Sequence, residues 1–266
     1  MIEISNLHKS FQGTPVLQGV DLTIADSERI VIIGGSGCGK SVLLRHIAGL
    51  LKPDRGGVKI DGQDLVPLTE RQLNPIRKKI GVLFQGAALF DSLDVFQNVA
   101  FSLQEERSFS EAEIRRRVSE ALEVVGMRGQ EKKKPAELSG GMRKRIGLAR
   151  AIINRPRIML YDEPTTGLDP QIADSINRLI LKMSRNFNVT SIVVTHDMVS
   201  AYMVGNRIAM LHRGKILVSG TPDEIQKCVN PTVQYFIKGI SDERDMDTLS
   251  ESTLNRTDLH AISSQH

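Results

Sequence analysis

The sequence predicts an α/β fold around a largely parallel sheet, and three observations indicate it. Four short runs rich in β-branched apolar residues have the composition of buried strands, at residues 29–33, 79–84, 157–163 and 190–194. Segments with helical periodicity lie between strands, most clearly after residue 41 and after Pro170. A glycine-rich turn, residues 34–41, joins the first strand to the first helix. Strands that alternate with helices are typical of a parallel sheet with helices on its faces.

The segment before residue 29 predicts antiparallel strands. Residues 2–4 alternate between apolar and polar side chains, and residues 16–24 do so less strictly. After the first helix, a turn at residues 53–57 precedes a short strand at residues 58–60. We therefore expect an N-terminal antiparallel β-subdomain that leads into the parallel core.

Residues 87–155 have a different character, because charged helical patterns replace the strands. Ser110 begins a Ser-Glu-Ala-Glu sequence typical of a capping box, which starts a helix that ends near Val125. A second helix follows Ser139. These patterns predict a helical subdomain inserted into the α/β core.

The remaining segments complete one predicted domain, residues 1–240, whose core covers residues 1–86 and 156–240. Its last part consists of hairpin strands and short helices, at residues 207–211 and 215–218, after Thr221 and after Pro231. Residues 241–266 are polar and are expected to form a flexible tail.

The composition indicates a globular chain that stays in the cytosol. The formal net charge of +4 permits contact with an acidic membrane surface and does not require a nucleic-acid partner. No apolar run reaches the roughly 18 residues of a membrane span, and the first residues lack the pattern of a secretory signal. Cys38 and Cys228 fit no metal-binding spacing and are expected to be reduced thiols. The basic clusters at residues 115–117 and 132–134 are interpreted as solvated surface.

Residues 34–41, Gly-Gly-Ser-Gly-Cys-Gly-Lys-Ser, match the pattern G-x-x-x-x-G-K-[ST] of a phosphate-binding loop. Glycines let successive backbone N–H groups converge on phosphate oxygens, and the helix N-terminus adds a favourable dipole. In this pattern Lys40 contacts the terminal phosphates and Ser41 offers its hydroxyl to Mg²⁺. The predicted nucleotide-binding residues of this segment are Gly34, Gly35, Ser36, Gly37, Cys38, Gly39, Lys40, Ser41 and Val42.

Four side chains come at the carboxyl ends of predicted strands, the edge at which α/β sheets bind ligands. Gln85 can reach the nucleotide metal and the attacking water. Asp162 can hold Mg²⁺, and the adjacent Glu163 can act on the attacking water as a general base. His196 can contact the γ-phosphate through a ring N–H. Phe11, near the end of an earlier strand, is a candidate to stack on the nucleotide base.

Each of these residues also has a simpler interpretation. Phe11 can be a packing aromatic, and Gln85 and His196 can be ordinary residues at strand ends. Asp162 and Glu163 alone would form a solvated acidic turn, but the phosphate loop favours a nucleotide site. For the other three residues, position alone leaves the choice open.

Leu138-Ser139-Gly140-Gly141-Met142, placed just before a helix, resembles the signature motif of ATP-binding cassette (ABC) ATPases. The resemblance covers about residues 2–238, and the other motifs of the family occur in order. It departs at Met142, where many ABC ATPases have glutamine. The resemblance implies a P-loop NTPase core of the ABC type that hydrolyses ATP with Mg²⁺.

The resemblance also implies roles for single residues. Phe11 would stack on the base, Gln85 would be the switch glutamine, Asp162 the metal-side acid, Glu163 the catalytic base and His196 the γ-phosphate switch. The implied catalytic set is Glu163, His196, Lys40 and Gln85, and the implied metal set is Ser41, Gln85 and Asp162.

A second chain is implied as well. In the family, the signature residues, here Ser139, Gly140 and Gly141, complete the phosphate site of the opposite subunit, and residues 167–169 form a dimer contact. Because this chain has one copy of each motif, we expect it to pair with a second ATPase subunit, as a homodimer, and to act on an integral-membrane permease.

Residues 84–101 look similar to the corresponding stretch of ATPases that serve MCE-type bacterial lipid transporters, including the Mla system of outer-membrane lipid asymmetry. Met142 and residues 233–239 are similar to that subfamily too. This predicts phospholipid transport, an MCE-domain lipid-binding partner and a peripheral position on the cytoplasmic face of the inner membrane. An apolar groove for a short helix of the membrane partner is expected from Leu89, Phe90, Val95 and Phe96.

Three other functions are alternatives to this prediction. The ATPase of an importer for amino acids or other small solutes shares the core motifs, and a soluble solute receptor among its partners would identify it. A non-transport ABC ATPase would be expected to carry two cassettes, a long coiled-coil insertion or a zinc module, none of which the sequence shows. A GTPase or small-molecule kinase would leave residues 138–141 unexplained.

Overall fold

The computed structural model describes residues 1–106 and 108–240. The predicted tail, residues 241–266, lies outside the described residues, and the predicted domain boundary at residue 240 stays a prediction. The chain divides into two compact units, of which the first is Met1–Pro222 and the second begins at Asp223.

One sheet of the first unit is the antiparallel subdomain, with strand order β2-β1-β4-β5. Its strands are β1 (Ile2–Phe11), β2 (Thr14–Ile24), β4 (Arg55–Ile60) and β5 (Gln63–Asp64). The antiparallel pairing of β1 with β2 and with β4 confirms the predicted character of this region. The predicted turn at residues 53–57 is shorter than expected, because β4 already begins at Arg55. Gly56 allows this, since a Cβ there would lie 2.1 Å from the carbonyl oxygen of Asn6 in β1.

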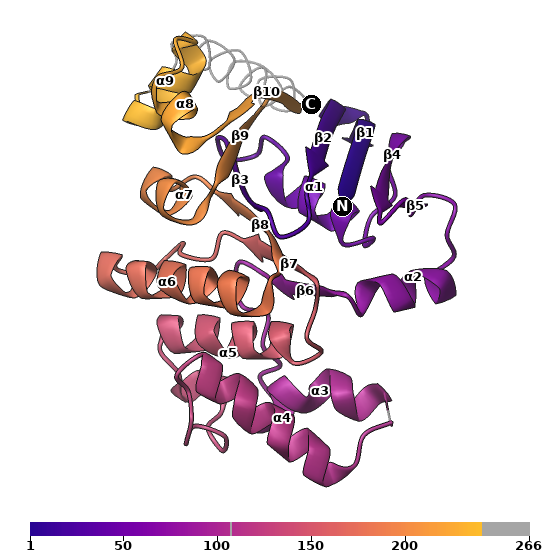
Figure 1. Cartoon of the computed structure of the whole chain (residues 1–266), viewed down its shortest axis with the longest axis vertical. Coiled ribbons are helices and arrows are strands. Elements are labelled where there is room, and N and C mark those ends of the chain that lie inside the picture. The colour runs from indigo at the N-terminus through magenta and orange to yellow at the C-terminus, as the bar shows by residue number, and fades with distance from the viewer. Residues whose placement is uncertain (107, 241–266) are drawn as a thin grey trace, which may run out of the picture. The chain divides into compact units, whose positions relative to one another are not determined.

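The second sheet has the order β10-β9-β3-β8-β7-β6 (Figure 1). Its strands are β3 (Arg29–Ile33), β6 (Ile80–Leu83), β7 (Ile158–Asp162), β8 (Thr190–Thr195), β9 (Arg207–His212) and β10 (Lys215–Gly220). The pairs from β9 to β6 are parallel, and β10 pairs with β9 antiparallel. All four predicted buried strands are therefore present, and the predicted hairpin, β9 and β10, forms one edge of the sheet.

Nine α-helices occur in the described residues. They are α1 (Lys40–Ile47), α2 (Glu70–Arg77), α3 (Val95–Glu106), α4 (Glu111–Val124), α5 (Gly140–Ile152), α6 (Pro170–Phe187), α7 (Met198–Val204), α8 (Pro222–Gln226) and α9 (Pro231–Lys238), and a 3₁₀ turn covers Pro135–Glu137. The helices α3, α4 and α5 pack on one another in the predicted helical region (Figure 1).

Helix caps explain where α4 and α5 begin. The Ser110 hydroxyl accepts a hydrogen bond from the N–H of Glu113, and the Ser139 hydroxyl accepts one from Met142, both at 3.3 Å. Three helices were not predicted individually: α2 contains Pro75, α3 lies in a stretch interpreted as a groove, and α7 has only seven residues.

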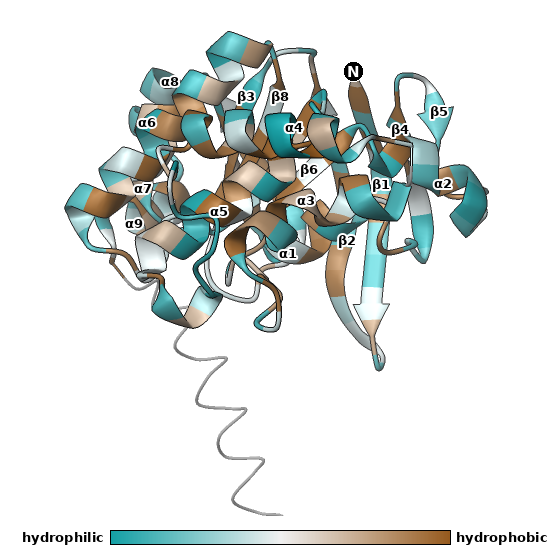
Figure 2. Cartoon of the chain, turned by 90° about the horizontal axis from the view of Figure 1, so that it is seen from below, coloured by the Kyte–Doolittle hydropathy of each residue, from teal (hydrophilic) through white to brown (hydrophobic). Residues whose placement is uncertain are grey.

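The helices that face the core show the expected periodicity. In α6 the buried residues include Ile176, Leu179, Ile180 and Met183, which form one stripe at helical spacing. Figure 2 shows hydrophobic and hydrophilic segments alternating along α4 and α6. Among the described residues, none of the helices combines the length and hydropathy that a membrane span requires.

The basic cluster at residues 115–117 lies on α4 and is paired with glutamates of the same helix. Hydrogen bonds from Arg116 and Arg117 hold the pKa of Glu113 at about 2. Arg115 and Arg116 are exposed, as the interpretation of a solvated surface requires, whereas Arg117 is half-buried.

Candidate active site

The register of the parallel sheet brings the predicted site residues to one edge. Ile33 at the end of β3 pairs with Thr195 at the end of β8, and Val194 pairs with Asp162 at the end of β7. The segments that follow these strands therefore start side by side. A pocket of about 660 Å³ opens there, lined by Phe11, Val16, Ser36, Gly37, Gly39, Lys40, Ser41, Val42, Gln85, Glu163 and His196. Of these residues, only Val16 was not predicted.

The phosphate loop needs glycine at two positions for steric reasons. Gly34 has φ 155°, and a Cβ there would lie 2.2 Å from the carbonyl oxygen of Leu211. Gly39 has φ 106°, and a Cβ there would meet the side chain of Leu17 at 2.8 Å. Gly34, Gly35 and Cys38 do not line the pocket, but they form the turn behind it.

The polar side chains considered next are Lys40 and Cys38 of the loop, together with the second cysteine, Cys228. The ammonium of Lys40, which is 7% exposed, donates to the carbonyl oxygens of Gly34 at 2.8 Å and Gly35 at 3.0 Å. Cys38 and Cys228 are unpaired. Burial raises the pKa of the Cys38 thiol, whereas the charge of Lys40 lowers it.

Ser41 and Asp162 form a pair of oxygen donors suited to Mg²⁺. The hydroxyl of Ser41 donates to a carboxylate oxygen of Asp162 at 2.8 Å. Mg²⁺ prefers one or two protein oxygens together with substrate phosphates and water. Among residues 1–106 and 108–240, no group of three or more His, Cys, Asp or Glu side chains could hold a metal ion, so this pair fits a metal whose other ligands come from nucleotide and solvent.

The carboxylate of Glu163 is buried and contacted by three side chains. Its Oε1 lies 3.7 Å from Nζ of Lys40, and its Oε2 lies 2.9 Å from Nδ1 of His196 and accepts a hydrogen bond from Thr166 at 2.9 Å. Glu163 is 8% exposed and has φ 48°, which is unusual for a residue other than glycine. The contacts orient the carboxylate at the pocket wall.

Phe11 lies at the rim of the pocket with 43% of its surface exposed. The ammonium of Lys9 is 5.7 Å from the centre of its ring. An exposed aromatic ring at the edge of a nucleotide-sized pocket has a free face for stacking.

Two residues beside the pocket were not predicted. Thr166 lies three residues after Glu163 and donates to its carboxylate. Lys144 of α5 donates to the carbonyl oxygens of both Gln85 and Glu163, the latter at 3.0 Å. A signal for Lys144 existed, because Gly141, Lys144 and Leu148 share the buried face of α5 at helical spacing.

The signature residues lie apart from this pocket. Ser139, Gly140 and Gly141 stand at the N-terminus of α5 and are not among the residues that line it. A Cβ on Gly141 would lie 2.6 Å from the side chain of Ile172 in α6, so glycine allows the close packing of these helices. These residues are therefore separate from the phosphate loop of the same chain.

The predicted apolar groove needs a correction. Val95 is 1% exposed, because it is the first residue of α3 and packs inside the helical region, so it cannot line a groove. Phe84, Phe90 and Phe101 are the large apolar side chains exposed in this stretch, and the rings of Phe90 and Phe101 are 4.7 Å apart. The exposed apolar surface therefore consists mainly of aromatic rings.

The fold and the site define a P-loop nucleotide hydrolase. Its features are a parallel sheet, a glycine-rich loop with a buried lysine, the hydroxyl–carboxylate pair of Ser41 and Asp162, and the acid Glu163 directly after Asp162. The model of the ABC transporter family matches residues 17–166, and the chain belongs to this family. As a member it hydrolyses ATP with Mg²⁺, and it works as an ATPase dimer with a membrane permease.

Relatives with different names match the chain. The probable ribonucleotide transport ATP-binding protein mkl of Mycobacterium tuberculosis is 41% identical over 94% of this chain and 72% of its own length. The putrescine transport ATP-binding protein PotG of Escherichia coli is 39% identical over 94% and 66%. The intermembrane phospholipid transport system ATP-binding protein MlaF of Haemophilus influenzae is 38% identical over 91% and 92%.

A solved structure has the same fold. It is the dimeric post-hydrolysis state of the ATP-binding cassette MJ0796 bound to ADP and Pi, with a TM-score of 0.78 and 34% identity over 84% of this chain and 99% of the other. The predicted fold class is thereby confirmed.

Proposed function

We propose that this chain is the ATPase subunit of a bacterial MCE-type phospholipid transporter, peripheral on the cytoplasmic face of the inner membrane. The observation that carries this proposal is the similarity to MlaF, which spans 92% of that relative, together with the resemblance of residues 84–101 and of Met142 to the same subfamily. Its partners would be a second copy of the chain, a permease and an MCE-domain lipid-binding protein.

The relative PotG supports a second candidate, an importer ATPase for a small solute, at a similar identity of 39%. Affinity purification of the tagged chain from membranes of its own host separates the two. A permease with an MCE-domain protein and bound phospholipid supports the first proposal. A permease with a soluble solute receptor would replace it by the second.

The same proposal assigns roles to the pocket residues. Lys40 binds the β- and γ-phosphates as a point charge, and the glycines of residues 34–39 present backbone N–H groups to them. Ser41 and Asp162 would hold Mg²⁺, which would neutralise phosphate charge, and Gln85, which follows β6 and lines the pocket, would be a further ligand. Phe11 stacks on the adenine.

Glu163 is proposed as the general base. Its carboxylate accepts a proton from the attacking water, while His196 contacts the γ-phosphate and holds the carboxylate at 2.9 Å. Such general-base catalysis accounts for about 10²–10⁴ in rate. Ser139, Gly140 and Gly141 bind the γ-phosphate of the ATP that is held by the partner chain. Hydrolysis removes this contact and therefore weakens the dimer.

The variant Glu163→Gln tests these roles, because it keeps the size of the side chain and removes its basicity. We expect ATP binding to persist, turnover to fall by about 10²–10⁴ and a dimer to accumulate with ATP, as measured by phosphate release and size-exclusion chromatography. Glu123→Gln is the matched control, since the Glu123 side chain on α4 is 64% exposed. Hydrolysis at the native rate in Glu163→Gln would remove Glu163 from the mechanism.

A further inference from the structure

Helix α5 carries two cations, a buried lysine and a half-buried arginine, that bind backbone carbonyl groups of the loops beside the pocket. Lys144 is 5% exposed, and its ammonium donates to the carbonyl oxygen of Gln85 and, at 3.0 Å, to that of Glu163. Two turns further along, the guanidinium of Arg150 donates to the carbonyl oxygens of Ala87 and Ala88, both at 2.7 Å. One helix thus holds the peptide groups that follow both β6 and β7.

The residues held in this way have a strained backbone. Glu163, Ala87 and Ala88 have φ values of 48°, 60° and 48°, in the left-handed region that side chains other than glycine rarely adopt. Such conformations persist only where the surroundings fix them. Because the carbonyl oxygens of these same residues accept hydrogen bonds from Lys144 or Arg150, helix α5 supplies part of that constraint.

Burying the ammonium of Lys144 costs free energy, and its hydrogen bonds and the nearby carboxylates offset this cost. Burial lowers the pKa of Lys144, whereas the negative charges of Asp162 and Glu163 favour its protonated form. Close packing around it leaves little freedom: a Cβ on Gly147, one turn away, would lie 2.8 Å from Leu83 and 3.1 Å from Ala87. The ammonium is therefore a fixed donor between two loops.

We propose that Lys144 is a positioning residue for ATP hydrolysis: by binding the carbonyl groups of Gln85 and Glu163, it holds the switch glutamine and the catalytic carboxylate in register with helix α5. This inference rests on the proposed roles of Gln85 and Glu163. Because α5 begins at the signature Ser139, one rigid element then connects the base of one half-site with the phosphate-binding residues offered to the other.

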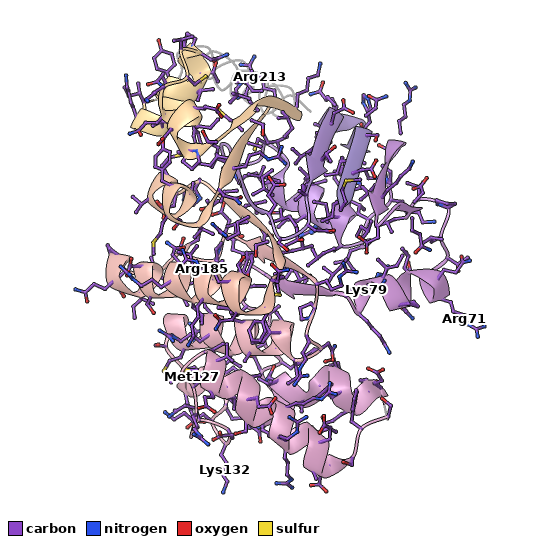
Figure 3. The ribbon with its side chains drawn as sticks, viewed as in Figure 1. Arg71, Lys79, Met127, Lys132, Arg185 and Arg213 are labelled. Carbon is purple, nitrogen blue, oxygen red and sulfur yellow. The ribbon has the colours of Figure 1, made fainter. Side chains whose placement is uncertain are left out.

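The test compares Lys144→Met, which removes the donors, with Lys144→Arg, which keeps the charge and the donors. Lys132→Met is the control, since Lys132 is exposed on the same subdomain and extends away from the ribbon (Figure 3). Each variant is assayed for thermal unfolding, for binding of a fluorescent ATP analogue, and for kcat and KM of ATP hydrolysis.

We expect Lys144→Met to lower kcat by about 10- to 100-fold, the range for losing about one charge-assisted hydrogen bond from the transition state, while the affinity for nucleotide changes by less than about threefold. Lys144→Arg should keep at least about a third of the native kcat, and Lys132→Met should behave as the native chain. This separation of kcat from binding, with rescue by arginine, is not expected from a residue that only stabilises the fold.

Native kcat in Lys144→Met overturns the inference, and so does an equal loss of kcat in Lys144→Met and Lys144→Arg. If Lys144→Met does not fold, Lys144→Gln takes its place, because the glutamine amide can still donate to one carbonyl oxygen. In Lys144→Gln, a reduced kcat with retained nucleotide binding supports the inference, and a native kcat overturns it. Glu163→Gln is measured in parallel. If it remains active, the proposed base is wrong; if it is inactive while Lys144→Met is fully active, only the role of Lys144 is wrong.

Discussion

The hydroxyl of Thr166 offers a sharp test of how the carboxylate of Glu163 is held. Thr166 donates to Oε2 of Glu163 at 2.9 Å, and the same oxygen lies 2.9 Å from Nδ1 of His196. Thr166→Val keeps the shape of the side chain and removes only this donor. The contacts of the carboxylate with His196 and Lys40 remain in this variant.

The size of the effect follows from the strength of the lost contact. A hydrogen bond to a charged group contributes about 1.5–3 kcal/mol, and water can replace part of it because Thr166 is only half-buried. We therefore expect a loss of about 1.5 kcal/mol from the transition state, which is about tenfold in kcat. The KM for ATP should change little, because Thr166 is not among the residues that line the pocket.

Steady-state phosphate release at saturating ATP and Mg²⁺ measures this effect. Thr166→Ser is the matched control, because it restores the hydroxyl without the methyl group, and its kcat should stay within about twofold of the native value. If Thr166→Val and Thr166→Ser both turned over like the native chain, the hydroxyl would have no part in orienting Glu163.

Two further variants test the metal pair and the aromatic surface. Ser41→Ala should raise the Mg²⁺ concentration for half-maximal hydrolysis by at least about tenfold, since it removes one oxygen donor; a Mg²⁺ titration at saturating ATP measures this, and an unchanged requirement would contradict it. Asn98→Leu should destabilise the chain by about 3 kcal/mol, because the fully buried amide accepts from the N–H of Phe90 and donates to the carbonyl oxygens of Phe90, Leu93 and Asp94, and the Phe90 N–H would lose its partner. Urea unfolding at constant m measures it, and an unshifted midpoint would disprove the role of Asn98.

The strands and the pocket were predictable because their signals are local. A run such as residues 29–33 shows its strand character by composition alone, and the spacing of residues 34–41 specifies its loop. The parallel register then places Gln85, Glu163 and His196 at one edge without further information from the sequence. For this reason ten predicted residues line the same pocket.

The contacts that sequence reasoning missed are not local. Lys144 is 59 residues from Gln85 and 19 from Glu163, and no periodicity in the sequence relates a lysine to two distant carbonyl groups. The prediction that Val95 lines a groove was wrong because its local signal is ambiguous. It is apolar in an apolar stretch, so composition fits a groove as well as a core, and only the packing of α3 against α4 and α5 decides.

The helical region contains a continuous series of contacts between the exposed aromatic surface and the proposed base. Asn98 of α3 binds the backbone of Phe90, α3 packs against α5, and Lys144 of α5 binds the carbonyl oxygen of Glu163. Arg150 adds a direct link, since its guanidinium lies 5.7 Å from the ring centre of Phe90 and also binds the backbone of residues 87 and 88.

A continuous series of contacts does not by itself demonstrate coupling between the aromatic surface and the base. Coupling requires an element with two arrangements, and binding at each site must shift the equilibrium between them. In this chain α5 binds the loop before α3 through Arg150 and the carbonyl oxygen of Glu163 through Lys144, and it begins at the signature residues. A shift of α5 therefore changes the support of the base and the position of Ser139 together. If a permease helix binds at Phe90, the physical consequence is that it acts on both half-sites through one rigid body rather than through separate loops.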